Sequence, residues 1–140
     1  MSTRFDPFFN NLVHKPKVFA VLSVLMRAMI SVIFVLSGTG KLFQYSNNAI
    51  YMQSQGISLN LLPLAILVEL GCGLMVLLGF QTRIAAFLLF GFTVVTAILF
   101  HTGSDMNSQI MFMKNISMAG GLLALVVFGA GGLSIDRNKQ

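Results

Sequence analysis

The chain has 140 residues, of which 56% are hydrophobic and only 9% are charged, and its mean hydropathy is +0.83. A soluble domain carries about 25% charged residues, so the composition excludes a soluble globular protein and indicates a membrane protein. The formal net charge of +5 is no sign of a nucleic-acid partner, because the basic residues flank the apolar runs, as membrane topology requires.

Segment 2–17, STRFDPFFNNLVHKPK, mixes aromatic and basic residues ahead of the first apolar run. Two interpretations are open for it: an amphipathic lead-in that lies in the membrane interface, or a disordered segment. Pro16 suits the point at which a helix starts.

Four apolar runs follow, at residues 18–38, 61–80, 83–101 and 110–132. A helix that crosses a bilayer needs roughly 20 mostly apolar residues, and these runs lack the period-2 alternation of a membrane β-barrel. The first run is too long for the apolar part of a cleavable signal and has no A-x-A exit, so we expect it to be retained. The sequence predicts an all-α, polytopic membrane protein: a single four-helix domain over 1–140, folded as an antiparallel bundle.

The connections between these runs differ in length. In the longest, 39–60, the stretch NNAIYMQSQGIS (47–58) is expected to form one short interfacial helix that stops at Gly56. The tight turn GFQTR (79–83) makes the second and third helices antiparallel neighbours, and the third connection, 101–109, is short and polar.

The basic residues that flank the helices predict the topology. Two of them, Lys41 and Lys114, are expected on one side of the membrane, and six are expected on the other. Those six are Arg4, Lys15, Lys17, Arg83, Arg137 and Lys139. Because positive charge accumulates on the cytoplasmic side, we expect a multi-pass protein of the bacterial inner membrane with both termini in the cytoplasm.

Two charged residues are predicted within the bilayer, where a charge costs about 2.5–3.5 kcal/mol or more. Arg27 lies roughly 14 Å from the cytoplasmic start of its run, and Glu69 lies roughly 12 Å from the opposite start of its own, at about 1.5 Å per residue. Both depths fall near the middle of an approximately 30 Å slab. We therefore expect Arg27 and Glu69 to form an ion pair between adjacent helices.

Further polar residues are expected to face the same interior, because helical spacing puts them on stripes with small residues. The stripe on the first helix is Arg27, Ser31, Phe34, Gly38 and Lys41, and that on the fourth is Lys114, Ser117, Gly121 and Ala124. Asn115 lies beside Lys114, and His101 ends the third helix. The candidate binding cluster is Arg27, Lys41, Glu69, His101, Lys114 and Asn115. Its surplus positive charge would attract an anion or polarise a carbonyl oxygen.

Structural interpretations compete with this one. The predicted pair of Arg27 and Glu69 could serve only to fix helix register, Lys41 and Lys114 could extend to the headgroups, and His101 could be an interfacial histidine. Of the remaining polar or small residues, Thr93 and Thr96 are expected to bond back to their own helix, Cys72 is expected to be a small packing residue, and Asp105 a solvated loop residue. No motif for a metal, a dinucleotide or an iron–sulfur cluster is present, and one membrane histidine does not supply two axial haem ligands in a monomer.

Several segments in order along residues 20–137 resemble the DoxX family of small bacterial inner-membrane proteins, especially its YqjF-like branch. They are RAMISVIFVLSGTGKL from Arg27, YMQSQGI, LVELGCGLMVLLGFQTR, TAILFH, MFMKN and LSIDR. The resemblance implies recurrent polar positions at Arg27, Lys41, Glu69, Lys114 and Asn115, without a catalytic role for any of them. The family is named for a subunit associated with a thiosulfate:quinone oxidoreductase, so the resemblance also implies a redox-associated membrane partner.

Three functions follow from these observations. The first is a quinone-linked accessory subunit of a redox protein, with quinone as the one cofactor considered. The second is a non-enzymatic module that binds or transports a small anion or apolar molecule, and the third is a structural partner of another membrane protein. Whether the chain is itself an enzyme is left open, because no catalytic motif is present.

Overall fold

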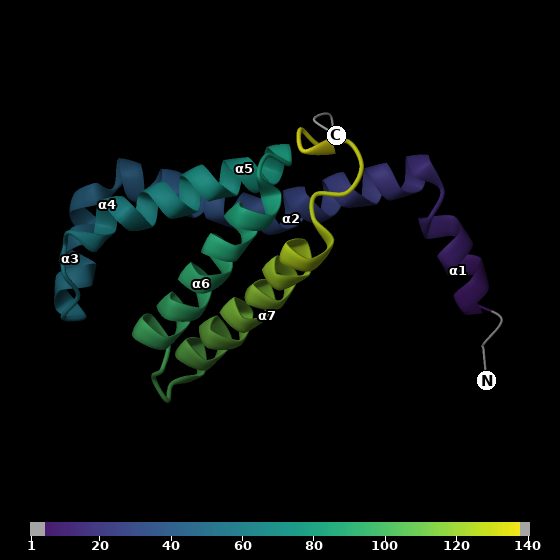
Figure 1. Cartoon of the computed structure of the whole chain (residues 1–140). Coiled ribbons are helices and arrows are strands. Elements are labelled where there is room, and N and C mark those ends of the chain that lie inside the picture. Colours follow the sequence, from purple (N-terminus) through teal and green to yellow (C-terminus); the bar gives the residue numbers. More distant parts are fainter. Residues whose placement is uncertain (1–4, 138–140) are drawn as a thin grey trace.

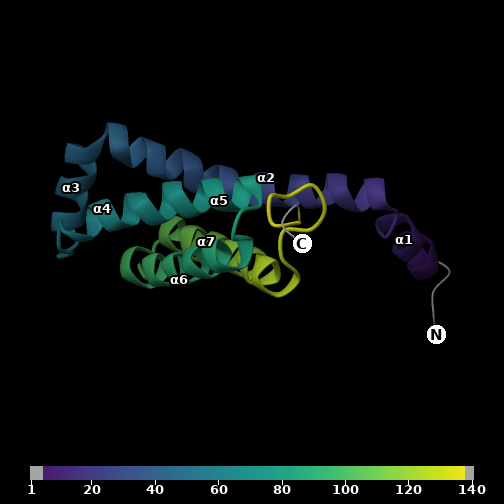
Figure 2. The same ribbon diagram turned by 45° about the horizontal axis from the view of Figure 1, so that its top comes forward.

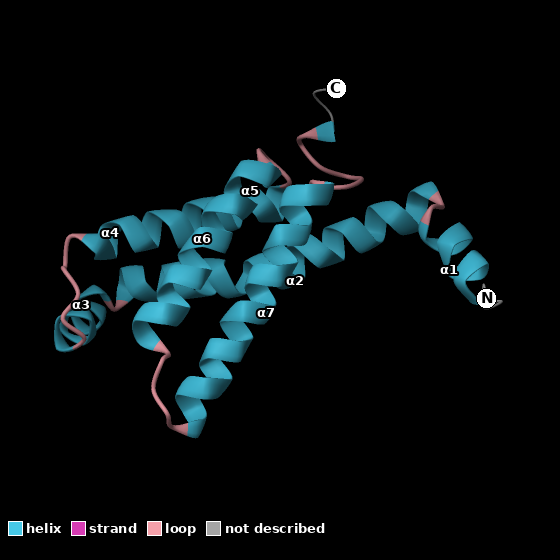
Figure 3. Cartoon of the chain, turned by 60° about the horizontal axis from the view of Figure 1, so that its bottom comes forward, coloured by secondary structure: helices cyan, strands magenta, loops and turns pink. Residues whose placement is uncertain are grey.

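The computed structural model describes residues 5–137, and in that range it consists of helices joined by short connections (Figures 1 and 3). In chain order the elements are α1 (Phe5–Val13), α2 (Pro16–Phe43), α3 (Tyr45–Ser54), α4 (Leu61–Ile66), the π-helical segment η1 (Leu67–Cys72), α5 (Gly73–Leu78), α6 (Thr82–Phe100) and α7 (Met106–Phe128). Three of them, α4, η1 and α5, follow one another without a break and form one continuous helix, Leu61–Leu78.

Four helices are long and apolar enough to cross a membrane: Pro16–Phe43, Leu61–Leu78, Thr82–Phe100 and Met106–Phe128. They match the four predicted spans to within a few residues. In each one, between 22% and 33% of the most apolar stretch is buried inside the protein. Most of every span is therefore left to contact lipid, which is the natural environment for its exposed apolar side chains.

The spans are arranged as two antiparallel pairs (Figures 1 and 2). The helix α4–η1–α5 lies along α2, and α6 packs along most of its length against α7. The two pairs meet where η1 and α5 contact α6, and they diverge toward the end that carries α3 (Figure 1). The prediction of alternating helix directions is confirmed, but the helices diverge instead of forming a uniformly packed bundle.

The core lies where the two pairs meet. It is made of fully buried side chains from all four spans: Phe34, Cys72, Val76, Ala85, Ala86, Leu89, Leu122 and Leu125. Cys72 is buried in this core as a small packing residue, as predicted.

The short elements also follow the sequence. The predicted interfacial helix is α3, and Gly56 follows it in a left-handed conformation with φ of 70°. Part of segment 2–17 forms α1, a helix that exposes Phe8 and Phe9. Arg4 and Lys139, which counted toward the predicted topology, lie outside the described residues.

Candidate functional site

The buried carboxylate of Glu69 has Lys41 as its cationic partner. Glu69 is 5% exposed, and its Oε2 lies 2.8 Å from Lys41 Nζ. The prediction that Glu69 pairs with Arg27 is wrong.

Arg27 is occupied elsewhere. Its guanidinium is 1% exposed and donates hydrogen bonds to the carbonyl of Leu77 at 3.0 Å and to that of Leu133 at 2.6 Å. The segment that follows α7, residues 129–137, is called the tail segment below, and the end of the molecule where it meets α2 and α5 is called the tail end.

The relative position of the helices explains the wrong prediction. On the antiparallel contact of α2 with η1 and α5, Gly38 lies against Leu70, whereas the Arg27 side chain lies against Gly79. Arg27 therefore stands eleven residues before the position that faces Glu69, a separation of roughly 16 Å along a helix. The predicted depths assumed that both helices enter the membrane at the ends of their apolar runs, but α2 extends well beyond α5 at the tail end (Figure 1).

Ser37 completes a small hydrogen-bonded ring around Glu69. Lys41 Nζ donates to Ser37 Oγ at 2.6 Å, and Ser37 Oγ donates to Glu69 Oε1 at 3.0 Å. Glu69 Oε2 is buried and within ion-pair distance of Lys41, but the contact lacks hydrogen-bond geometry. Sequence reasoning missed Ser37, although its place four residues before Lys41 puts the two side chains on one helical face.

Glu69 projects from the π-helical segment η1. Such turns are rare and occur frequently at functional sites. Sequence reasoning missed this turn, which contains Gly71 and is followed by Gly73. Gly73 also lets α2 approach closely, because a Cβ atom there would meet Val35 Cγ2 at 3.1 Å.

A cavity of about 560 Å³ lies between the two diverging helix pairs. We call it the pocket. Five of the six residues of the predicted cluster line it: Lys41, Glu69, His101, Lys114 and Asn115. The sixth, Arg27, does not.

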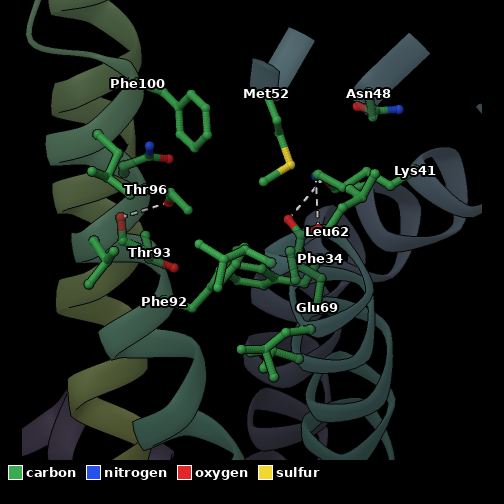
Figure 4. A pocket seen from close by; sticks show the side chains of 18 of the residues that line it. Phe34, Lys41, Asn48, Met52, Leu62, Glu69, Phe92, Thr93, Thr96 and Phe100 are labelled. Carbon is green, nitrogen blue, oxygen red and sulfur yellow. Dashed lines mark hydrogen bonds and ion pairs between the residues drawn. The ribbon is translucent and has the colours of Figure 1, made fainter. Parts of the chain in front are cut away.

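Most of the pocket wall is apolar. Figure 4 shows Lys41 and Glu69 on one side, with Thr93 and Thr96 on the opposite wall formed by α6. Apolar and aromatic walls include Phe34, Met52, Leu62, Phe92 and Phe100. At the end nearest α3, Tyr51 stacks on Phe100 with ring centroids 5.7 Å apart.

The polar residues on the second helix pair differ in exposure. Asn115 is 8% exposed, and its amide has no hydrogen-bond partner among the described residues. Lys114 is exposed and His101 is partly buried. The buried face of α7 runs through Asn115, Ala119, Leu122 and Leu125, so the predicted inward stripe that begins at Lys114 is off by one residue.

The competing interpretations can now be separated in part. Lys41 turns inward to Glu69, which contradicts the expectation that it extends to the headgroups. Lys114 is exposed and also lines the pocket, so its extension to the headgroups stays a prediction. Thr93 donates to the carbonyl of Leu89, and Thr96 donates to that of Thr93, so both bond back to α6 as predicted.

The pocket thus combines an apolar interior with an ion pair at one wall and an unpaired amide at the other. An amide can both donate and accept hydrogen bonds, so a bound molecule with a polar atom at that wall would find a partner in Asn115. Within the described range, no group of three or more His, Cys, Asp or Glu residues is placed to hold a metal ion.

Four apolar spans, with a pocket between them, define a multi-pass α-helical membrane protein. The DoxX family profile matches residues 12–102, and the chain belongs to the DoxX family. It is 42% identical to inner membrane protein YqjF of Escherichia coli K12 over 117 residues, which cover 81% of this chain and 90% of YqjF. It is 33% identical to inner membrane protein YphA of the same organism over 125 residues, which cover 84% of this chain and 89% of YphA. No solved structure matches the chain.

Proposed function

We propose that the protein is a binding subunit of the inner membrane that holds a small, lipid-soluble molecule of the quinone class and acts beside a redox partner. The pocket is the observation that carries this proposal. Its volume of about 560 Å³ lies within the 300–1,000 Å³ that is usual for sites of small molecules, and such sites combine apolar walls with a few placed polar groups.

The residues that line the pocket suit a ligand with a flat ring, polar atoms at the edge of that ring, and an apolar tail. Aromatic side chains from α2 and α6, Phe34, Phe92 and Phe100, line the pocket beside Lys41 and Asn115. Lys41 and Asn115 can both donate hydrogen bonds to the oxygens of such a ring.

Apolar residues at the edge of the pocket favour entry of the ligand from the bilayer. Leu64 on α4 and Val95 and Leu99 on α6 line the pocket, and each is about half exposed on the lipid-facing surface. Because α4 and α6 belong to the two helix pairs that diverge (Figure 1), a lipid-soluble molecule could pass between them without crossing a polar barrier.

The alternative of a small anion as ligand has less support. It was based on three cations around one acid, but Arg27 lies at the tail end and Lys41 is neutralised by Glu69. Lys114 is the remaining lysine at the pocket, and it is exposed.

The same proposal places both termini in the cytoplasm. Four basic residues support this: Lys15 and Lys17 at the start of α2, Arg83 at the start of α6, and Arg137 in the tail segment. The positive-inside rule assigns the end that carries them to the cytoplasm. Since Cys72 is buried, a membrane-impermeant thiol reagent applied to intact spheroplasts should label Ser104→Cys and leave Gln81→Cys unlabelled. The reverse pattern would contradict this orientation.

The binding function is tested by titrating the purified protein in lipid nanodiscs with a short-chain benzoquinone. Saturable binding at one site per chain is expected, and Asn115→Leu, which keeps the side chain close to its original size, should weaken it about tenfold, the loss of roughly one good hydrogen bond. Ile116→Val, which lies outside the pocket on the same helix, is the matched control. Partitioning indistinguishable from that of empty nanodiscs would overturn the proposal.

A further inference from the structure

We infer that α1 is an interfacial helix that binds anionic lipid at the surface of the bilayer that α2 enters. The face of α1 that carries Phe8 and Phe9 contacts the lipid chains. Lys15 and Lys17, which follow α1, contact the phosphates of the headgroups. This inference is independent of the ligand in the pocket, because α1 contributes no residue to the pocket wall.

The apolar and polar residues of α1 lie on opposite sides of the helix. Phe8 is 63% exposed and Phe9 is 58% exposed, and their rings meet edge to face with centroids 5.7 Å apart. A strongly amphipathic helix with exposed aromatic side chains is typical of segments that lie in a membrane interface. At about 100° per residue, the apolar side holds Phe8, Phe9, Leu12 and Val13, and the polar side holds Asp6, Asn10 and Asn11.

The bend between α1 and α2 is fixed by Lys15 and Pro16. The residue before a proline avoids helical dihedral angles, and Lys15 is extended, with φ of −62° and ψ of 128°. α1 therefore does not continue the line of α2. Figures 1 and 2 show it turned away from that line, with none of the other spans beside it. The rings of Phe8 and Phe9 are thus left uncovered by the protein.

The junction of the two helices lies at the level of the lipid headgroups. The apolar run of α2 begins at Val18, directly after Lys17, so the boundary of the hydrocarbon core falls near Lys17. The 28 residues of α2 span about 42 Å, more than the roughly 30 Å of that core, so this helix is long enough to reach the headgroup layer. α1 ends four residues before Lys17, which places it beside the same layer.

Lys15 and Lys17 favour lipid over protein as the occupant of this surface. Both are exposed, and neither side chain forms an ion pair or a hydrogen bond within residues 5–137. Basic residues beside a membrane are attracted to anionic headgroups, by about fivefold in association per residue. A bilayer offers an apolar layer beneath an anionic one, so a single occupant satisfies both the aromatic face and the two lysines.

The position of α1 can be measured in the full-length protein, because the chain contains no tryptophan and a single introduced one reports its surroundings. Phe9→Trp places it on the apolar side, and Asn11→Trp, the matched control, places it on the opposite side. In nanodiscs that contain one chain and phosphatidylglycerol, brominated lipid should quench Phe9→Trp. Aqueous acrylamide should quench Phe9→Trp about threefold less than Asn11→Trp.

Two results would overturn the inference. One is equal access of acrylamide to both positions, which would show that α1 lies in water. The other is protection of Phe9→Trp from acrylamide without quenching by brominated lipid, which would show that protein covers this face. Both substitutions lie outside the core of the four spans, so neither should disturb the fold.

The role of the lysines is tested by replacing phosphatidylglycerol with phosphatidylcholine. Acrylamide quenching of Phe9→Trp should then rise about twofold, because the attraction of Lys15 and Lys17 to the surface is lost. With Lys15→Gln and Lys17→Gln together, the two lipids should give the same quenching, whereas Lys114→Gln, an exposed lysine on another helix, should keep the difference. A difference that persists without Lys15 and Lys17 would overturn their contact with anionic lipid.

Discussion

Two cations on α2, Arg27 near the middle of the helix and Lys41 in its last turn, look alike in the sequence and behave differently in the structure. Arg27 is enclosed by carbonyl groups of the chain itself, from α5 and from the tail segment. Lys41 forms an ion pair with Glu69, and both residues line a cavity. Each group keeps one buried atom without a hydrogen-bond partner, Arg27 Nε and Glu69 Oε2, so the difference between the two places is the cavity, which Lys41 and Glu69 line and Arg27 does not.

The tail end is held together by contacts between residues that lie far apart in the sequence. Besides the Arg27 bonds, Asp136 accepts hydrogen bonds from the backbone N–H groups of Gln81 at 2.7 Å and Thr82 at 3.0 Å. Asp136 thereby satisfies donors at the start of α6, a region where every helix has unpaired N–H groups. Gly79 has φ of 70°, and an added Cβ would come within 2.5 Å of both Arg27 and Ser134, so only glycine fits beside this group of contacts.

The largest expected effect tests whether Arg27 stabilises the fold by holding the tail segment. Arg27→Met removes two hydrogen bonds from a charged donor and leaves the carbonyls of Leu77 and Leu133 without that partner, so we expect a loss of about 3 kcal/mol in the free energy of unfolding. Reversible denaturation in mixed micelles measures it. A loss below about 1 kcal/mol would show that the tail segment is not held by Arg27.

A smaller effect is expected at the contact between α2 and η1. A Cβ on Gly38 would lie 2.9 Å from the backbone nitrogen of Leu70, whereas nothing lies within 4 Å of one on Gly40. Gly38→Ala should therefore cost about 1–3 kcal/mol through overpacking and weaken ligand binding by displacing η1. Gly40→Ala is the matched control in the same helix, and it should be neutral or stabilising. Equal effects of the two substitutions would contradict the described contact.

The cap at α6 should contribute less. Asp136→Ala removes the acceptor of two backbone N–H groups, which corresponds to about 1 kcal/mol for a helix cap. Amide hydrogen exchange at the first turn of α6 should accelerate, while exchange in α7 stays unchanged. Unchanged protection of Thr82 would contradict the role of Asp136.

The smallest effect concerns the connection between α6 and α7. Ser108 donates its hydroxyl and its backbone N–H to Asp105, the residue that caps α7, and these hydrogen bonds lower the pKa of Asp105 below its usual 3.8. A lowered folded-state pKa stabilises the protein above the unfolded pKa, and this stabilisation is lost as pH falls through the folded-state value. The difference in melting temperature between the unaltered protein and Asp105→Ala should therefore shrink from pH 6 to pH 3. A difference that grows toward low pH would contradict this account.

Much of the fold could be predicted from the sequence, because hydropathy alone sets the length and number of apolar helices. The inward face of α2 was also predictable, since Arg27, Ser31, Phe34 and Gly38 recur at helical spacing, and all four are buried. The face of α7 was predicted one residue out of place, because Lys114 was assumed to point inward, while the buried position is Asn115.

The partners of the charged residues could not be predicted, because they depend on how far one helix is shifted along another. Depth counted from the end of an apolar run assumes equal insertion, and α2 breaks that assumption by beginning at Pro16, well before the level at which α5 ends. The carbonyls that hold Arg27 carry no signal in the sequence either, since any residue could supply them. The π-helical turn at Glu69 was likewise missed.

The most direct test of the central claim measures benzoquinone binding and thermal stability together in Asn115→Leu and Arg27→Lys. The account predicts that Asn115→Leu weakens benzoquinone binding about tenfold, while Arg27→Lys melts at a lower temperature and keeps its affinity for benzoquinone. Weaker binding in Arg27→Lys, or unchanged binding in Asn115→Leu, would contradict the division of the molecule into a tail end held by Arg27 and a binding pocket.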